Sequence, residues 1–255
     1  MRVMTFNLRF ENDRDGDDSW SRRRDVAVAV IERHTPDLLG TQEGTPAQLA
    51  FLLDNLSAYG MVAAQRPDDP SCQYPTLFYR SDRMLPLSWG EFWLSSTPTE
   101  HRSKGWDSAF PRMMSFGRFK DLLAGRELWV AVTHLDHLGA LARFEQGRII
   151  AQWVTARDAP VILTGDFNDA PDSSVHRLLT SPQVGLIDSW LGLGPPEGEA
   201  SMTHHDFRGV PQKCRMDWVL TTRELKAVSV QILRDHVSGR YPSDHFPFVA
   251  ELAWR

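Results

Sequence analysis

The stretch Ala159-Pro160-Val161-Ile162-Leu163-Thr164-Gly165-Asp166-Phe167-Asn168 decides how this chain is interpreted. Its continuous apolar run over 159–164 predicts a buried strand, and the polar residues Asp166 and Asn168 follow that strand at once. Loops that follow strands carry reactive groups over a rigid scaffold. Asp166 and Asn168 are therefore the first candidates for a functional site.

Acidic, amide and histidine side chains also recur where other predicted strands stop. Hard cations such as Mg²⁺ take oxygen ligands from carboxylates and amides, and they commonly bind through one or two carboxylates together with a substrate phosphate. A single aspartate at a strand end more often makes a turn or caps a helix, so the inference rests on the whole set. That set consists of Asn7, Glu43, Asp136, Asp166, Asn168, Asp217, Asp244 and His245.

In its first third, the chain alternates predicted strands and helices. The segment 59–119 contains repeated prolines, which favours antiparallel strands with long loops over helices. Together these elements predict an α/β fold, with two mixed sheets face to face and helices on the flanks. Strands are predicted over 3–8, 37–43, 127–133, 159–164, 215–220, 227–233 and 246–253, a polar loop over 11–19, and helices over 20–34, 46–56, 139–156 and 175–180.

Composition limits the classes of function. The 255 residues, 42% hydrophobic and 24% charged, predict one globular domain over 1–255. A net charge of -5 does not favour a dedicated duplex-binding protein, although a local basic rim could still hold a polyanion. Two cysteines predict neither a disulfide framework nor a zinc site by their spacing. With no apolar run long enough for a signal peptide or a membrane span, a cytoplasmic monomer without a membrane partner is expected.

Six short blocks follow one another in a recognisable order. They are Phe6-Asn7, Thr41-Gln42-Glu43, Thr133-His134-Leu135-Asp136-His137, Thr164-Gly165-Asp166-Phe167-Asn168, Arg215-Met216-Asp217-Trp218 and Ser243-Asp244-His245-Phe246-Pro247. In this order the chain resembles the endonuclease/exonuclease/phosphatase superfamily, the deoxyribonuclease I-like fold, over essentially its whole length. The resemblance implies a four-layered α/β sandwich of two packed mixed β-sheets flanked by helices, in agreement with the pattern of elements.

The resemblance also implies a metal centre. Glu43 would be the principal ligand of Mg²⁺ (or Mn²⁺), with Asn7 and Asp244 as further ligands. Asp166 would orient or deprotonate the attacking water. A bound cation makes such a role feasible for a carboxylate, because it acidifies the water and neutralises charge.

The remaining catalytic residues implied by the resemblance act on the phosphate. Asn168 and His134 would hold its oxygens. His245, paired with Asp217, would hydrogen-bond the scissile phosphate and stabilise its developing charge. A carboxylate beside an imidazole fixes the tautomer and favours the protonated form, which suits this role.

Three residues outside these sets are candidate substrate contacts. Arg9 stands where one branch of the family has Asp and another has Arg; it could grip a phosphate bidentately or be a solvated arginine after a strand. Asp136 belongs to a form of the histidine block that resembles a bacterial subgroup related to the carbon-catabolite-repressor deadenylases, which places it close to the site. His205 follows His204; the pair could belong to a zinc site if other ligands were near, or be loop histidines beside the cleft.

The segment 93–112 also resembles that subgroup and supplies three further candidates. Lys104 and Arg112 are predicted phosphate contacts. Trp106 could be a stacking platform for a sugar or base, and equally a core residue.

Three functions from different classes are consistent with these residues. The first is a metal-dependent phosphatase acting on a small phosphorylated substrate, a sugar phosphate or a nucleotide. The second is a nuclease on DNA or RNA, an endonuclease or a deadenylase-like exonuclease, which a basic groove with stacking aromatics would indicate. The third, a non-catalytic binding protein on the same fold, is disfavoured because Glu43, Asp166, Asn168 and His245 are all present.

Overall fold

A computed structural model of the chain describes residues 1–63 and 65–255. The first of its two mixed sheets contains β1 (Arg2–Asn7), β2 (Leu38–Gly44), β3 (Tyr59–Val62), β4 (Tyr74–Arg80), β11 (Leu225–Ile232) and β12 (Phe248–Trp254). The second contains β5 (Met84–Trp93), β6 (Met113–Asp121), β7 (Arg126–His134), β8 (Val161–Asp166), β9 (Ile187–Asp188) and β10 (Asp217–Thr221). Their strand orders are β11-β12-β1-β2-β4-β3 and β5-β6-β7-β8-β10-β9.

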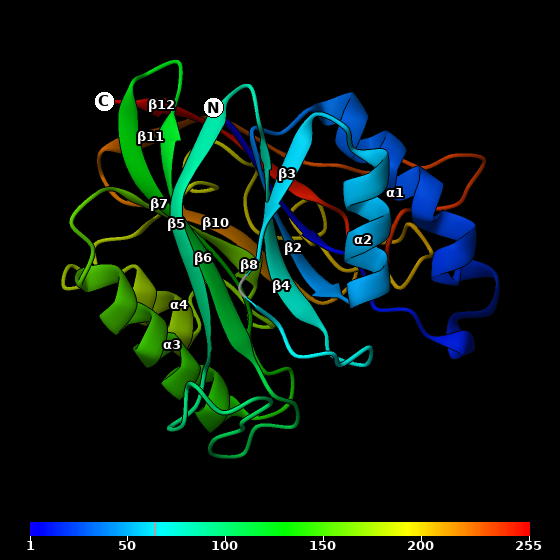
Figure 1. Ribbon diagram of the computed structural model, residues 1–255, viewed down its shortest axis with the longest axis horizontal. Coiled ribbons are helices and arrows are strands. Elements are labelled where there is room, and N and C mark those ends of the chain that lie inside the picture. Colours follow the sequence, from blue (N-terminus) through cyan, green and yellow to red (C-terminus); the bar gives the residue numbers. More distant parts are fainter. Residues whose placement is uncertain (64) are drawn as a thin grey trace.

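Helices cover the outer face of each sheet. α1 (Trp20–His34) and α2 (Pro46–Asn55) lie on one side of the molecule, and α3 (Ala140–Thr155) and α4 (Ser174–Leu179) on the opposite side (Figure 1). The predicted four-layered α/β sandwich is therefore confirmed.

Each interface between layers has its own apolar cluster. Val3, Val132 and Ile162 are fully buried between the two sheets. A second cluster joins the first sheet to α1 and α2, and a third joins the second sheet to α3 and α4. β8 is buried at every position because both of its faces are covered. This explains why its sequence begins as a continuous apolar run.

The two sheets approach closely at Gly40 in β2. A Cβ at this position would overlap Thr164 Oγ1 of β8 and lie 3.0 Å from a methyl of Val132 in β7. Only a residue without a side chain fits between the sheets here. This close approach keeps the strand ends of the two sheets near one another.

Local signals explain most element boundaries. α2 begins with Pro46 after a capping box in which the Thr45 hydroxyl accepts from the Gln48 backbone N–H and the Gln48 side chain accepts from that of Thr45. Two features differ from the sequence prediction. The segment expected as a loop contains a 3₁₀ helix, η1 (Asp13–Asp18), whose first turn the Asn12 side chain caps, and β9 is too short for a periodic pattern to reveal.

Candidate active site

The candidate residues gather where strands of both sheets end. β1 pairs in parallel with β2, and β7 in parallel with β8, so the carboxyl ends of each pair meet at one edge. β10 runs antiparallel to β8 and begins opposite its end, with Asp217 paired to Asp166. The first sheet and its loops supply Asn7, Glu43, Asp244 and His245, and the second supplies His134, Asp166, Asn168 and Asp217.

Asn7, Glu43 and Asp166 are brought together across the sheets. The Asn7 amide nitrogen lies 3.0 Å from Asp166 Oδ2 and 3.3 Å from Glu43 Oε1. The other Glu43 oxygen accepts from the Phe10 backbone N–H at 3.0 Å. Because the Asn7 amide oxygen accepts from the Arg9 N–H, the Asn7 NH₂ group faces the two carboxylates, and direct metal ligation by Asn7 would require the amide to turn over.

Asp217, His245 and Asp166 form a buried chain of charges. His245 Nδ1 lies 2.8 Å from Asp217 Oδ2, and His245 Nε2 lies 3.8 Å from Asp166 Oδ2. Burial acts to lower the pKa of His245, but the charge of Asp217 and its hydrogen bond raise it to about 10. Burial and the charge of Asp217 raise the pKa of Asp166 to about 7. The arrangement therefore holds an imidazolium beside a carboxyl group that titrates near neutrality.

His134 and Asn168 lie on the other side of Asp166. His134 Nε2 is 2.8 Å from the Asn168 amide nitrogen and 3.6 Å from Asp166 Oδ2. Burial and the charge of Arg112 lower the pKa of His134 well below its usual value, so this imidazole is neutral. The Asn168 amide also donates to the Leu135 carbonyl, which fixes its orientation.

Two of these residues have left-handed backbone conformations. Glu43 has a φ of 63° and Asn168 a φ of 51°. Such conformations are costly for residues other than glycine, and they cluster at active sites where the surroundings hold them in place. Both side chains are thus held by the fold in orientations that an ordinary strand end would not give.

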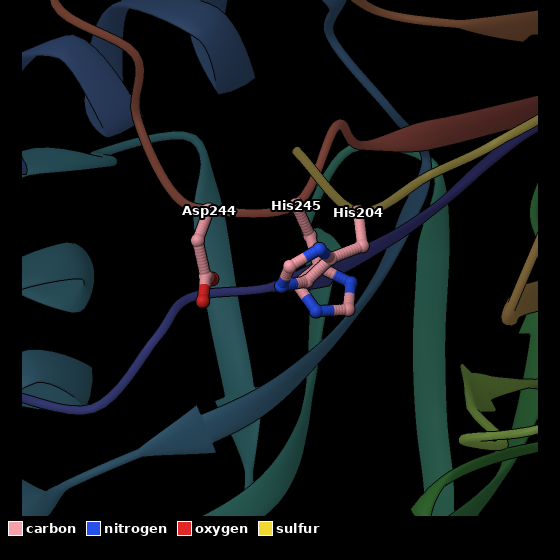
Figure 2. Close-up of side chains that lie close together, drawn as sticks. All are labelled: His204, Asp244 and His245. Atoms are coloured by element: carbon pink, nitrogen blue, oxygen red, sulfur yellow. The ribbon is translucent and has the colours of Figure 1, made fainter. Parts of the chain in front are cut away.

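Asp244 groups with two histidines (Figure 2). The rings of His204 and His245 meet edge to face with centroids 5.1 Å apart, and one ligand atom of each lies within 4.8 Å of the others and of Asp244. Because His245 Nδ1 is bonded to Asp217, only its Nε2 could join such a metal site, and only after losing its proton. Burial would raise the pKa of Asp244, but the charge of His245 lowers it overall.

The residues present fit a divalent cation. The side chains of Glu43 and Asp166 offer only oxygen donors, which a hard cation prefers. Asp166 is a buried carboxyl group beside a second one, Asp217, and burial and that neighbouring charge raise its pKa. Asp217 Oδ1 is buried and has no hydrogen-bond partner within residues 1–63 and 65–255. These features favour an added positive charge at the strand ends.

Arg112 is a buried cation beside this site. Its side chain is 9% exposed, its Nη2 lies 3.3 Å from His137 Nδ1, and its Nε has no hydrogen-bond partner in the described part of the chain. It lines a pocket of about 260 Å³ together with Phe10, Gln73, Phe110 and His134. An arginine placed in this way is ready to receive an anionic group.

The other two candidates from the segment 93–112 do not line this pocket. Trp106 is 44% exposed, which excludes the alternative that it is a core residue. Lys104 Nζ lies 3.3 Å from the Ala109 carbonyl of its own loop. The structure therefore separates Arg112 from Lys104 and Trp106, which the sequence had grouped together.

Arg9 points to a partner in its own loop. Its guanidinium holds both carboxylate oxygens of Asp15, at 3.0 and 2.9 Å. The predicted bidentate grip on a phosphate would require this pair to open. The solvated alternative does not describe Arg9 either, because its side chain is only 27% exposed.

Asp136 and His205 differ from their predicted roles as substrate contacts. Asp136 is fully buried, and both of its oxygens accept hydrogen bonds from the surrounding loops. His205 is also fully buried; its ring stacks on Phe246 at 3.8 Å and burial lowers its pKa to about 3. Asp136 and His205 are therefore buried residues that hold neighbouring segments in place and are not substrate contacts. This corrects the sequence interpretation.

Some residues at the site were missed by sequence reasoning. Gln73 and Arg102 line the pocket, but both come from long loops without a recognisable pattern. Arg215 belongs to the block 215–218, but its role was not predicted. It is fully buried and pairs with Asp188 at 2.7 Å, and this ion pair anchors the start of β10 beside Asp217. No signal in the sequence pairs residue 188 with residue 215.

Comparisons with known proteins concern the family and the fold of the chain. A family model described as "Endonuclease/Exonuclease/phosphatase family" matches residues 4–245. A structure of a mannosyl-6-phosphatase from Bacteroides thetaiotaomicron is similar at 29% identity with a TM-score of 0.89, over 100% of both chains. TDP2 of D. rerio, complexed with a single-strand DNA product, is similar in fold, at 18% identity and a TM-score of 0.79 over 99% of this chain and 98% of that chain.

Curated relatives match over a shorter stretch. Nocturnin of Drosophila melanogaster is 26% identical over 176 residues, which are 63% of this chain and 26% of that protein. Nocturnin of Rattus norvegicus is 27% identical over 51% of this chain and 35% of its own length. The chain thus spans about a quarter to a third of the length of these relatives. Among the described residues, no helix has the length and apolar character needed to cross a membrane.

Proposed function

This chain belongs to the endonuclease/exonuclease/phosphatase family, whose members hydrolyse phosphoesters, and from that premise we propose that it is a divalent-cation-dependent phosphomonoesterase acting on a small sugar phosphate. The observation that carries the proposal is the pocket of about 260 Å³ between His134 and Arg112. Its volume is slightly below the range of roughly 300–1,000 Å³ typical of small-molecule sites. A pocket of this size suits one sugar ring rather than a polymer.

The lining of the pocket supports a sugar. Phe10 and Phe110 offer aromatic faces, against which the C–H face of a sugar ring can pack, and Ser71, Gln73 and Arg102 offer hydrogen-bonding groups for hydroxyls. The full-length similarity to a mannosyl-6-phosphatase, at 29% identity, points in the same direction. A nucleotide monophosphate is the second small substrate that this lining would admit.

In the proposed mechanism, Glu43 would be the main ligand of Mg²⁺ or Mn²⁺, with Asp244 as a further ligand and the Asn7 amide 3.3 Å from Glu43 Oε1. When bound, the cation supplies positive charge to the phosphate oxygens. Asp166 holds the attacking water and accepts its proton at Oδ2. The neighbouring Asn7 amide keeps that oxygen oriented, at a distance of 3.0 Å.

The phosphate is held from the other side by hydrogen-bond donors. Asn168 and neutral His134 are the proposed contacts to its oxygens, for which the hydrogen bond from the Asn168 amide to His134 Nε2 would have to open, and Arg112 lines the same pocket as His134. Protonated His245 donates from Nε2 to the oxygen where charge develops, while Asp217 keeps the proton on Nδ1.

The test is phosphate release from a panel of hexose phosphates and nucleotides, with Mg²⁺, with Mn²⁺ and with chelator. Labelled single-stranded and duplex DNA and RNA are incubated in parallel. The proposal expects cation-dependent release from a sugar phosphate while the polynucleotides stay intact. Cleaved polynucleotide with little free phosphate would instead establish a nuclease, the function of the second class.

A further inference from the structure

Asp136 lies at the centre of a buried network that joins three segments of the chain. Its Oδ2 accepts from the backbone N–H groups of Ala109 and Phe110, at 2.9 and 3.1 Å, and from the Ser108 hydroxyl at 3.1 Å. Its Oδ1 accepts from the N–H groups of Leu138 and Gly139, at 3.0 and 2.7 Å. One carboxylate therefore connects the loop before β6 to the start of α3.

Gln146 of α3 completes the network. Its side-chain oxygen accepts from the Asp136 N–H at 2.9 Å, and its nitrogen donates to Ser108 Oγ at 3.3 Å. Ser108 Oγ also lies 2.7 Å from the Phe110 carbonyl, and its single proton is shared between that carbonyl and Asp136 Oδ2. All three side chains are at least nine-tenths buried. Bonds of this kind are shielded from water, so the loop has few alternative conformations.

The network ends at the two residues that form one wall of the substrate pocket. Phe110 is bonded through both its N–H and its carbonyl. The Nε of Arg112 lies 3.9 Å from Asp136 Oδ2, and its Nη2 is 3.3 Å from His137, whose ring packs against Phe110 with centroids 5.5 Å apart. Burial raises the pKa of Asp136, but the backbone hydrogen bonds and the charge of Arg112 lower it overall, so the carboxylate is charged.

We propose that Asp136, acting with Ser108 and Gln146, is a positioning residue that determines substrate affinity by fixing Phe110 and Arg112 in the pocket wall. It touches neither the phosphate nor the attacking water. This inference rests on the proposed function insofar as it assigns the pocket to the substrate.

The test compares Asp136→Asn with Asp121→Asn. Asp121 is a matched control: it is also buried, and it accepts from the N–H groups of Leu123 and Ala124 and from Trp254 Nε1. It is the last residue of β6, at the end of that strand far from Met113. In Asp136→Asn an NH₂ group replaces one of the accepting oxygens, while the shape of the side chain is kept. Ser108→Ala and Gln146→Leu are milder variants that remove the supporting contacts and leave the Asp136 carboxylate, with its four backbone donors, in place.

Kinetics are measured with whichever phosphoester the wild-type protein cleaves. Asp136→Asn is expected to raise KM about tenfold or more and to change kcat less than about twofold, since hydrogen bonds to a charged group are lost in the wall and not at the reacting atoms. Ser108→Ala and Gln146→Leu are expected to raise KM by a smaller factor. Asp121→Asn is expected to lower the melting temperature without changing KM. Equal KM values for Asp136→Asn and Asp121→Asn would overturn the proposal, as would a loss confined to kcat.

A second readout needs no substrate. Hydrogen exchange of the segment 105–112 is expected to quicken in Asp136→Asn and to stay unchanged in Asp121→Asn, because only Asp136 accepts from the Ala109 and Phe110 amides. Unchanged exchange there would overturn the positioning role even if no sugar phosphate were a substrate. A wild-type protein that cleaves only polynucleotides would overturn the proposed function, and the exchange result would still decide the role of Asp136.

Discussion

The Nδ1 atom of His245 lies 2.8 Å from Oδ2 of Asp217, and the two residues come from different sheets. His245 stands in the loop before β12, whereas Asp217 begins β10. The charge of Asp217 favours a proton on each ring nitrogen of His245, so Nε2, 3.8 Å from Asp166 Oδ2, can act as a donor in the site. A contact between the sheets thereby sets the protonation of a proposed catalytic group.

Replacing Asp217 by Asn should weaken this donor. The raised pKa of His245, about 10, extends its protonated form to alkaline pH, and loss of the Asp217 charge moves that pKa downward. We expect kcat to fall by about tenfold or more. The alkaline limb of the kcat–pH profile should move to lower pH. The pH–rate profiles of the wild type and the variant check this, and coincident alkaline limbs would contradict it.

Asp166→Asn should abolish turnover and leave substrate binding in place. A proposed general base contributes about 10²–10⁴-fold, and asparagine cannot accept the proton from water. Single-turnover kinetics and equilibrium binding of a phosphate ester measure the two effects separately. Asp172→Asn, which changes an exposed carboxylate a few residues away, is the control. Near-normal activity of purified Asp166→Asn would remove Asp166 from the role of water activator.

Glu43→Gln should raise the concentration of Mg²⁺ or Mn²⁺ needed for half-maximal activity. A neutral amide binds a hard cation less strongly than a carboxylate does, so we expect a shift of at least about tenfold. Metal titrations of activity, after chelator treatment, measure the shift. Glu11→Gln, at an exposed position in the neighbouring loop, should titrate like the wild type. An unchanged titration of Glu43→Gln would exclude it from the ligand set.

Arg112→Ala should raise KM for a phosphorylated substrate by about 10- to 100-fold, more than it lowers kcat, since a charge-assisted hydrogen bond is lost in the pocket wall. Arg112→Lys keeps the charge without the planar fork and should recover only part of the affinity. Arg148→Ala on the exposed face of α3 is the control. If kcat fell while KM stayed unchanged, Arg112 would instead act on the transition state.

Gly40→Ala should force the two sheets apart. The added Cβ would overlap Thr164 Oγ1 and press on Val132, an overpacking expected to cost about 1–3 kcal/mol of the free energy of unfolding. Activity should fall further than stability alone explains, because the site spans both sheets. Denaturant unfolding and kcat are the two measurements. Gly198→Ala, where a Cβ meets nothing within 4 Å, should change neither the stability nor kcat. Full activity of Gly40→Ala would show that the spacing between the sheets tolerates the methyl group.

The order of strands and helices could be predicted because buried strands in this fold are short apolar runs followed at once by polar residues, as at Asp166. The roles of Arg9 and Asp136 could not be predicted from the sequence. Arg9 binds Asp15 only because a 3₁₀ turn brings that residue back toward the strand end. The backbone donors to Asp136 Oδ2 come from a loop more than 20 residues earlier in the chain, which no local pattern reveals.

His204 and His205 show the same limit on a smaller scale. They are adjacent and chemically identical, yet His204 lies against His245 while His205 stacks on Phe246. Packing partners on distant segments decide which of the two faces the site. A sequence alone presents them as equivalent.

Because the site is divided between two sheets, its activity depends on complete folding. Neither half of the sandwich carries a complete set of groups, so a partly folded chain, in which one sheet has formed and the other has not, would be catalytically silent. With the proposed site residues, hydrolysis would begin only when the two sheets have packed together. Activity is therefore a direct report that folding has been completed.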